Sequence, residues 1–280
     1  MTISFKAYIP GQGTHNNVAQ VFRFPGGEWH LRNIWPFENQ KVHWIADVRG
    51  ADPNDLVKAA LLGTHASARG ERYTLMLPYL PAARADRGTV LGVDAYAGLA
   101  RAGRPQAVIG VDPHSPAAHV WYDNLRVVDS VDLVERALLG TYDGVISPDK
   151  GALGRATRVA DRLGVDLYRA EKQRDFDTGR ILSMWLTSPV PKKGRYLVVD
   201  DICDGGGTFN FLAETIALPR EQLSLWVSHG IFSGNANALH KSYERIYTTD
   251  SHPGAYMGVV RPSSIVPVWP YMFRAMTKGK

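Results

Sequence analysis

The sequence of 280 residues lacks the features of secreted and membrane proteins. It has one cysteine, Cys203, which excludes an intramolecular disulfide and a zinc site built from several cysteines. Its apolar runs are much shorter than the ~18 residues that span a bilayer. Residues 1–13 lack the basic and apolar regions of a signal peptide. We therefore expect a cytoplasmic protein that does not enter a membrane.

Charge of one sign is also scarce. The chain has 32 Lys and Arg against 27 Asp and Glu, a formal net charge of +5 that is spread along the sequence. Because no lysine- or arginine-rich stripe is present, we expect no nucleic-acid partner, and small anions suit this balance better. Hydrophobic residues make up 45% of the chain, which is typical of a folded protein with a core.

Short apolar runs rich in β-branched and aromatic residues alternate with longer amphipathic stretches. This alternation predicts an α/β fold in which a mostly parallel sheet is flanked by helices. The two halves of the chain share the pattern, which indicates two similar domains over residues 1–135 and 136–280. The predicted strands are Val42–Val48, Tyr73–Leu77, Ala107–Val111, Asp143–Ser147, Val165–Ala170, Tyr196–Asp201, Leu223–His229 and Arg245–Thr249.

Helix signals fill the intervals between these strands. Asp52 can cap a helix whose first turn contains Pro53 and which ends near Arg69, and a second helix is predicted over 92–102. After the fourth strand, apolar residues at helical spacing predict a helix over 152–163. Its polar face carries the arginines Arg155, Arg158 and Arg162. Residues 173–193 have no clear period, so we expect a long mobile loop there, of the kind that serves as a functional lid.

The strongest local signal is the segment Tyr196–Phe209, in which an apolar strand ends in two aspartates and turns through three glycines into a helix. Glycines allow backbone N–H groups to approach phosphate oxygens, and a helix N-terminus adds positive potential. The aspartates suit the hydroxyls of a ribose, and Thr208 can cap the helix or donate to the phosphate. The segment therefore predicts a sugar-phosphate site formed by Asp200, Asp201, Asp204, Gly205, Gly206, Gly207 and Thr208.

With these residues the segment resembles the phosphoribosyl-diphosphate motif of the type I phosphoribosyltransferase fold, and the chain is most similar to ribose-phosphate diphosphokinases. Further segments resemble motifs of that family in the same order. They are Phe24–Glu28 (Phe-Ser-Asp-Gly-Glu in the family), Leu77–Arg87 (Pro-Tyr…Ala-Arg-Gln-Asp-Arg), Val111–Ser115 (Asp-Leu-His-Ala), Ser147–Gly151 (Ser-Pro-Asp-x-Gly), Glu171–Arg174 (Asp-Lys-Arg-Arg) and Ser228–Gly234 (Thr-His-Gly-x-x-Ser-Gly).

The resemblance implies two phosphoribosyltransferase-like domains and transfer of diphosphate from ATP to the anomeric hydroxyl of ribose 5-phosphate, with Mg²⁺ as cofactor. It also implies a role for each matched residue. Lys172 and Arg174 are the catalytic cations of a loop over 171–193, and His114 and Asp149 are the metal ligands. Phe24, Glu28, Arg84, Asp86 and Arg87 match the nucleotide site. Since the family's Phe24 loop reaches the site of a neighbouring subunit, a homo-oligomer is implied, either a dimer or a hexamer.

Three segments depart from the family pattern. Gly26 and Ala85 replace polar residues near the nucleotide, and Gly205–Gly206 replace a Thr-Ala pair in the phosphate loop. A roomier phosphate loop leaves open a larger acceptor such as ADP-ribose. A phosphoribosyltransferase and a non-catalytic subunit of a synthetase are two further readings. The motifs of the first half argue against a transferase, and the intact cations argue against a non-catalytic subunit.

Overall fold

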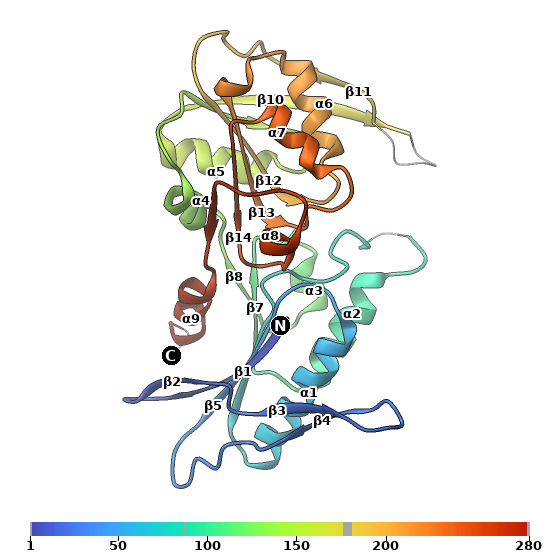
Figure 1. Ribbon diagram of the computed structural model, residues 1–280, viewed down its shortest axis with the longest axis vertical. Coiled ribbons are helices and arrows are strands. Elements are labelled where there is room, and N and C mark those ends of the chain that lie inside the picture. The colour runs from blue at the N-terminus through green and yellow to red at the C-terminus, as the bar shows by residue number, and fades with distance from the viewer. Residues whose placement is uncertain (1, 87, 176–180, 279–280) are drawn as a thin grey trace. The chain divides into compact units, whose positions relative to one another are not determined.

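The computed structural model describes residues 2–86, 88–175 and 181–278, which Figure 1 traces through the fold. The chain divides into two compact units. Unit 1 comprises Met1–Val128 and Trp269–Lys280, and unit 2 comprises Asp129–Val268. The division differs from the single boundary expected between residues 135 and 136, because the last helix returns to the first unit. Lys6 lies over the Trp269 ring at 4.7 Å, and Tyr8 meets Phe273 edge to face at 5.2 Å.

Unit 1 is built around a mixed sheet with the strand order β2-β1-β5-β6-β7-β8. Strands β5 to β8 are parallel, whereas β1 is antiparallel to both of its neighbours. The elements of unit 1 are β1 (Ile3–Ile9), β2 (Gly13–Asn16), β3 (Gln20–Arg23), β4 (Trp29–Arg32), β5 (His43–Val48), α1 (Pro53–Ala68), β6 (Arg72–Met76), α2 (Gly92–Arg101), β7 (Ala107–Val111), α3 (Ala118–Trp121), β8 (Leu125–Val128) and α9 (Trp269–Thr277).

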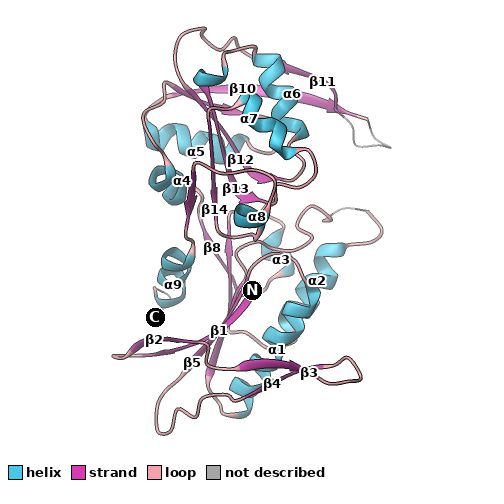
Figure 2. Cartoon of the chain, in the orientation of Figure 1, coloured by secondary structure: helices cyan, strands magenta, loops and turns pink. Residues whose placement is uncertain are grey.

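Helix α1 begins as its sequence predicts. The side chain of Asp52 accepts a hydrogen bond from the Asn54 N–H at 2.9 Å, and Pro53 occupies the first helical position. The buried face of α1, with Leu56, Ala59 and Leu62, contacts β5 and β6. Helix α1 thus covers one face of the sheet of unit 1, as Figure 2 shows by secondary structure.

Unit 2 has the strand order β11-β10-β9-β12-β13-β14-β15, in which every neighbouring pair except β10–β11 is parallel. The elements are α4 (Val131–Ala137), β9 (Gly144–Ser147), α5 (Leu153–Leu163), β10 (Asp166–Arg174), β11 (Ile181–Leu186), β12 (Tyr196–Cys203), α6 (Gly207–Ile216), the 3₁₀ turn η1 (Arg220–Gln222), β13 (Leu223–Gly230), the 3₁₀ turn η2 (Ala236–Ala238), α7 (Leu239–Ser242), β14 (Arg245–Thr249), α8 (Gly254–Met257) and β15 (Ser264–Val266).

The central strands of unit 2 are buried on both faces. Every residue of β13 is buried, as are all but one of β12, so neither strand shows the alternation of a half-exposed sheet. Helix α6 packs its Phe209 and Leu212 into a core that includes Val198 and Leu225. Helix α5 contacts β9, β10 and β12. The predicted α/β class and the predicted strands are therefore confirmed, with small differences at strand ends.

The segment predicted as a long loop over 173–193 contains regular structure. Strand β10 runs on to Arg174 and pairs antiparallel with β11, so that Lys172 lies opposite Met184. The prediction of an unstructured loop was wrong for Ile181–Leu186. Tertiary pairing forms this strand although its sequence has no strict period. Part of the expected catalytic loop, 176–180, lies outside the described residues.

Over the described ranges, none of the helices combines the length and the apolar composition that crossing a membrane would require.

Candidate active site

The carboxyl ends of β9, β10, β12 and β13 meet at one edge of the sheet of unit 2. Strand β9 pairs with both β10 and β12, and β12 pairs with β13. Strand β10 extends beyond its last pairing with β9, Arg169 with Ser147, and this extension carries Lys172 over the end of β9. Ligands of open α/β sheets bind at this kind of edge, so these strand ends form the candidate site.

Lys172 forms an ion pair with Asp149, joining the predicted catalytic cation to a predicted metal ligand. Lys172 Nζ contacts Asp149 Oδ2, and the other carboxylate oxygen accepts the Ala152 N–H at 3.0 Å. Burial raises the pKa of Asp149, but the hydrogen bond and charge of Lys172 together with two backbone N–H groups outweigh burial and hold that pKa below its usual value. Asp149 is therefore an anion that can hold a cation.

Asp200 and Asp201 lie at the end of β12 with exposed fractions of only 9% and 3%. The Asp201 N–H donates to Asp200 Oδ1 at 2.9 Å. Burial raises the pKa of Asp200 well above its usual value, and the nearby charge of Asp201 raises it further, while Arg155 acts in the opposite sense. The two carboxylates can accept hydrogen bonds, but burial disfavours their negative charge unless a cation lies beside them.

That cation is Arg155, which the sequence pattern placed on the polar face of its helix. The structure buries Arg155 to 7% exposure and sets its guanidinium against both aspartates. The first turn of α5 follows β9, the sheet neighbour of β12, so a residue there reaches the end of β12. The sequence shows that Arg155 follows the end of a strand closely. Helical periodicity alone, however, assigns a charged residue on the polar face to solvent.

The glycine loop after β12 places its three glycines in different environments. Gly206 is buried with φ +79°, and a Cβ there would approach Leu239 and Ala236 at 3.2–3.3 Å. Gly205 and Gly207 are exposed, and a Cβ on either would meet nothing within 4 Å. Gly206 therefore shapes the turn, whereas Gly205 and Gly207 leave open space in front of the backbone at the start of α6, where N–H groups can receive a phosphate.

Thr208 does not cap helix α6, contrary to one of the two roles predicted for it. The helix begins at Gly207, and its N-cap is Gly206, which makes no side-chain capping bond. A left-handed glycine at the N-cap sets the entry of the chain, so the hydroxyl of Thr208 lies in the first turn rather than before it. Its predicted contact with a phosphate stays a prediction.

The loop after β13 holds the glycine loop in place. The N–H groups of Ile231 and Phe232 donate to the Cys203 carbonyl at 2.9 and 3.1 Å. The Ser233 hydroxyl donates to Asp204 Oδ1 at 2.5 Å. This support comes from the Ser228–Gly234 segment that resembles a family motif, and it fixes the position of Asp204.

Two histidines that the sequence left as structural or surface residues lie behind this loop. The ring of His229 is buried and its Nδ1 is 2.7 Å from Ser251 Oγ. His252 Nδ1 accepts the Gly254 N–H at 3.0 Å. Burial lowers the pKa of His252 to about 4, with the proximity of His229 adding to the effect and Asp204 opposing it. His252 is therefore neutral at physiological pH.

In unit 1 the predicted nucleotide and metal residues lie in the loops after β6 and β7. Arg84 and His114 are exposed and Asp86 is partly buried, while Arg87 lies outside the described residues. Asp112 starts the β7 loop with φ 36° and is buried. His114 belongs to unit 1 and Asp149 to unit 2. Within the described ranges, no group of three or more His, Cys, Asp or Glu side chains is arranged to hold a metal.

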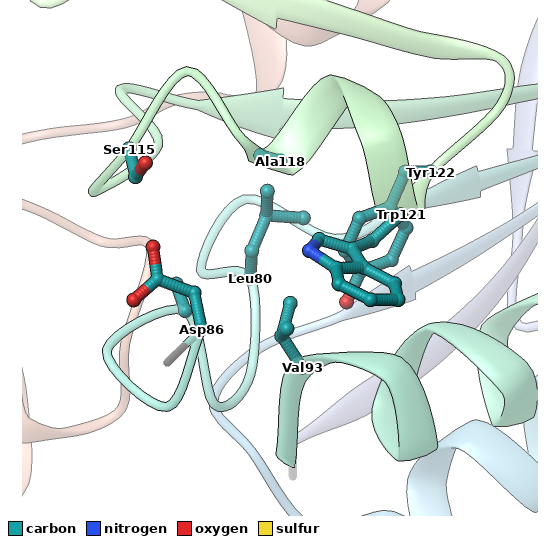
Figure 3. Close-up of a pocket in the computed structure, with 8 residues that line it drawn as sticks. Leu80, Asp86, Val93, Ser115, Ala118, Trp121 and Tyr122 are labelled. Atoms are coloured by element: carbon teal, nitrogen blue, oxygen red, sulfur yellow. The ribbon is translucent and has the colours of Figure 1, made fainter. Parts of the chain in front are cut away.

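A small pocket lies between these two loops (Figure 3). Leu80, Val93 and Trp121 contribute its apolar wall, and Asp86 and Ser115 line its polar side. The Tyr122 hydroxyl is buried with no hydrogen-bond partner among the described residues, and burial raises the pKa of this tyrosine. Its accessible volume of about 10 Å³ is the size of one water molecule, so the pocket as it stands does not hold a nucleotide base.

The remaining predicted nucleotide residues lie in the turn of the β3–β4 hairpin. Phe24 is 46% exposed and stacks on His30 with a centroid distance of 6.0 Å, and Glu28 is also exposed. Backbone hydrogen bonds between Phe24 and Glu28 close the turn. In Figure 1 the hairpin turn projects from the rest of unit 1. An exposed aromatic at such a turn is available to a separate molecule.

Arg174 is the one predicted catalytic residue whose side chain lies outside the description. Its backbone closes β10, and the pairing with β11 shifts register between Gln173 and Arg174. The position of the Arg174 side chain remains a prediction.

The whole chain was compared with known proteins. No model of a known protein family matches the chain. The chain is 27% identical over 242 residues to the ribose-phosphate pyrophosphokinase of Sulfolobus acidocaldarius, covering 82% of this chain and 83% of that protein. It is 27% identical over 272 residues to that of Thermococcus kodakarensis, covering 89% and 91%.

A solved structure shows the same fold. The crystal structure of phosphoribosylpyrophosphate synthetase from Mycobacterium smegmatis superposes with a TM-score of 0.68 and 21% sequence identity, covering 94% of this chain and 91% of that one. The two units therefore define a protein with two phosphoribosyltransferase-like domains. Within that class the chain is a homologue of the ribose-phosphate pyrophosphokinases, as the motifs predict.

Proposed function

We propose that this chain is a ribose-phosphate pyrophosphokinase, an enzyme that moves diphosphate from ATP to ribose 5-phosphate. The observation that carries the proposal is the meeting of Lys172 with Asp149, and of Asp200 and Asp201 with Arg155, beside an open glycine loop at one sheet edge. The homologues carry the name of this activity. They do not favour an ADP-ribose acceptor, a phosphoribosyltransferase or a non-catalytic subunit.

In the reaction the anomeric oxygen of ribose 5-phosphate attacks the β-phosphorus of ATP. The bond from the β-phosphorus to the oxygen that bridges it to the α-phosphorus breaks, and AMP leaves with that oxygen. The anomeric hydroxyl releases its proton to solvent, and phosphoribosyl diphosphate forms. Negative charge grows on the transferred group and on the leaving oxygen, so cations placed there lower the barrier. Lys172 fills this role in the proposal, and Arg174 is proposed as its partner.

The acceptor is held by the residues of the glycine loop. The backbone N–H groups from Asp204 to Thr208 receive the 5-phosphate, because Gly205 and Gly207 leave the backbone open to it. Asp200 and Asp201 accept hydrogen bonds from the sugar hydroxyls. The pattern of one open strand end, one glycine turn and one helix start suits an acceptor with a phosphate at one end and hydroxyls in the middle.

Of the two proposed ligands of Mg²⁺, Asp149 in unit 2 fits the ion better than His114 in unit 1. Asp149 offers an ionised carboxylate, and Mg²⁺ usually binds one or two carboxylates together with substrate phosphates and water. His114, an exposed imidazole, is a weaker donor for so hard a cation and is proposed to act through a bound water. Bound Mg²⁺ would supply positive charge to the triphosphate, and Asp149 is the residue that would hold it.

The nucleotide is proposed to bind unit 1. Arg84 suits the triphosphate because a guanidinium binds two phosphate oxygens at once. Asp86 and Arg87 are assigned to the same site by the motif that they share with the family. Phe24 and Glu28 are proposed to contact the adenine of a neighbouring copy of the chain, which the exposure of the hairpin turn supports. The active form is then a homo-oligomer, a dimer or a hexamer, which light scattering on the purified protein measures directly.

Product analysis tests the proposal. The purified protein is incubated with ATP, Mg²⁺ and ribose 5-phosphate, and mass spectrometry follows AMP and phosphoribosyl diphosphate. We expect equal amounts of both products, formed only when all three components are present. ADP-ribose in place of ribose 5-phosphate serves as the competing acceptor, compared by kcat/KM. Absence of AMP, or AMP that does not depend on the sugar phosphate, would contradict the proposal.

A further inference from the structure

Arg155 makes a contact that the proposed reaction does not itself explain. Its Nη1 lies 3.3 Å from Asp200 Oδ1 and its Nη2 lies 3.5 Å from Asp201 Oδ2. The guanidinium of Arg155 thus contacts one oxygen of each carboxylate. Its exposed fraction is 7%, so water has little access to the ion pairs and the geometry is held by the protein.

The other arginines of α5 behave differently. Arg158 is 50% exposed and pairs with Asp129 at 3.1 Å, and Arg162 is 43% exposed and pairs with Asp132 and Glu135. They have the same side chain on the same helix, but they serve surface ion pairs of small energetic weight. Arg158 is therefore a matched control for Arg155.

The position of the two aspartates makes a shared cation informative. Residues adjacent in a strand normally point to opposite faces of the sheet, yet one guanidinium reaches both carboxylates at the end of β12. The buried carboxylates of Asp200 and Asp201 also repel each other. The fork of Arg155 counters both tendencies, because it fixes the planes of the carboxylates and balances part of their charge.

We propose that Arg155 is a positioning residue that holds Asp200 and Asp201 in register with two neighbouring hydroxyls of the sugar, and so sets the preference for ribose over 2-deoxyribose phosphates. The inference rests on the proposed function, since it assumes a sugar phosphate at this loop. A site built to accept hydrogen bonds from a hydroxyl rejects the analogue that lacks it, because a buried acceptor is left unpaired. That rejection requires carboxylates that cannot turn away.

Binding of ribose 5-phosphate and of 2-deoxyribose 5-phosphate, measured by calorimetry without ATP, tests the inference. For the wild-type protein we expect ribose 5-phosphate to bind about 10-fold more tightly or better, the range of a hydrogen bond to a charged group. In Arg155→Lys, which keeps the charge but loses the fork, the preference falls to about 3-fold or less. Arg158→Lys keeps the wild-type preference.

Kinetics and chemical rescue give a second test. In Arg155→Lys the KM for ribose 5-phosphate rises about 10-fold while the KM for ATP stays the same, because only the sugar contacts loosen. In Arg155→Ala, added guanidinium ion restores the ribose preference, and added ammonium ion does not. Thermal unfolding of each variant reports whether the fold is kept.

The outcomes separate the two proposals. If the wild-type protein prefers ribose 5-phosphate but Arg155→Lys weakens both sugars equally, or changes neither, the role of Arg155 is overturned and the proposed function stands. If the folded wild-type protein binds neither sugar phosphate, the proposed function fails and the inference fails with it.

Discussion

The charged side chains at the carboxyl edges of the two sheets differ in how far they are buried. In unit 2, Asp149, Asp200 and Asp201 are buried or partly buried, and each is matched to Lys172 or Arg155. In unit 1, Arg84 and His114 are exposed. Because a charge can be buried only with a partner, the edge of unit 2 is assembled before any ligand arrives. The side chains of Arg84 and His114 in unit 1 are in contact with solvent.

This contrast predicts that the two edges respond differently to substitution. Changes at the edge of unit 2 should alter chemistry, sugar recognition and stability, since its groups act through each other. Changes at the exposed residues of unit 1 should alter nucleotide affinity and leave stability unchanged. The four predictions below test this, starting with the largest effect.

Lys172→Ala removes the cation that the proposal places on the migrating charge. We expect kcat to fall by about 10²–10³-fold, the usual effect of losing one such group. The control is Lys150→Ala, which removes an exposed charge next to Asp149 and should leave kcat within about 2-fold of wild type, as a surface ion contributes little. Initial rates of AMP formation measure both, and equal losses in the two variants would remove Lys172 from the mechanism.

Two glycines of the loop can be used to test its backbone shape and its access to ligand separately. Gly207→Ala adds a methyl group to open space, so the unfolding temperature stays the same while affinity for ribose 5-phosphate falls about 10-fold through steric conflict with the phosphate. Gly206→Ala forces an alanine to φ +79° and against Leu239, which destabilises the fold by about 1–2 kcal/mol. Thermal unfolding and calorimetry on both variants check the pair. A Gly207→Ala protein with wild-type affinity would place the phosphate elsewhere.

Arg84→Ala tests the exposed edge. Because its side chain is exposed, we expect no change in unfolding temperature and a rise of about 10-fold in the KM for ATP, the loss of one charge-assisted contact. The KM for ribose 5-phosphate should not change. A destabilised variant, or one with altered sugar affinity, would break the comparison between the two edges.

Features of the fold that depend on neighbouring residues could be predicted from the sequence, whereas features that depend on tertiary contacts could not. The strand and glycine turn of Tyr196–Phe209 and the Asp52 cap were predicted because their signals are local, a run of apolar residues or a side chain two positions from its partner. The burial of Arg155 depends on which strand lies beside which, and helical periodicity carries no such information.

Two parts of the fold were missed for a related reason. Strand β11 forms because β10 is available to pair with it, and α9 returns to unit 1 because Lys6 and Tyr8 of β1 receive it. The partners of α9 lie near the start of the chain, whereas β10 directly precedes β11, whose sequence lacks the period that would have indicated a strand. Of the candidate site, the residue types were predicted, but the pairing of Lys172 with Asp149 and the support from Ser233 required the structure.

The edge of unit 2 also makes stability depend on pH through His252. Its folded-state pKa of about 4 lies below the usual ~6.5. The unfolded chain therefore takes up the proton first as the pH falls, and this residue lowers stability progressively from about pH 6.5 to pH 4. We expect His252→Gln to lose less stability over that window, by a margin of about 1 kcal/mol, since part of the side chain is exposed. Urea unfolding at a series of pH values measures it, and identical slopes for both proteins would contradict the assignment.

A crystal structure of the protein with ribose 5-phosphate tests the central claim most directly. The account predicts the phosphate on the backbone N–H groups between Asp204 and Thr208, with the sugar hydroxyls against Asp200 and Asp201. A ribose 5-phosphate bound away from this loop, with the aspartates still closed on Arg155 and turned from the sugar, would contradict it.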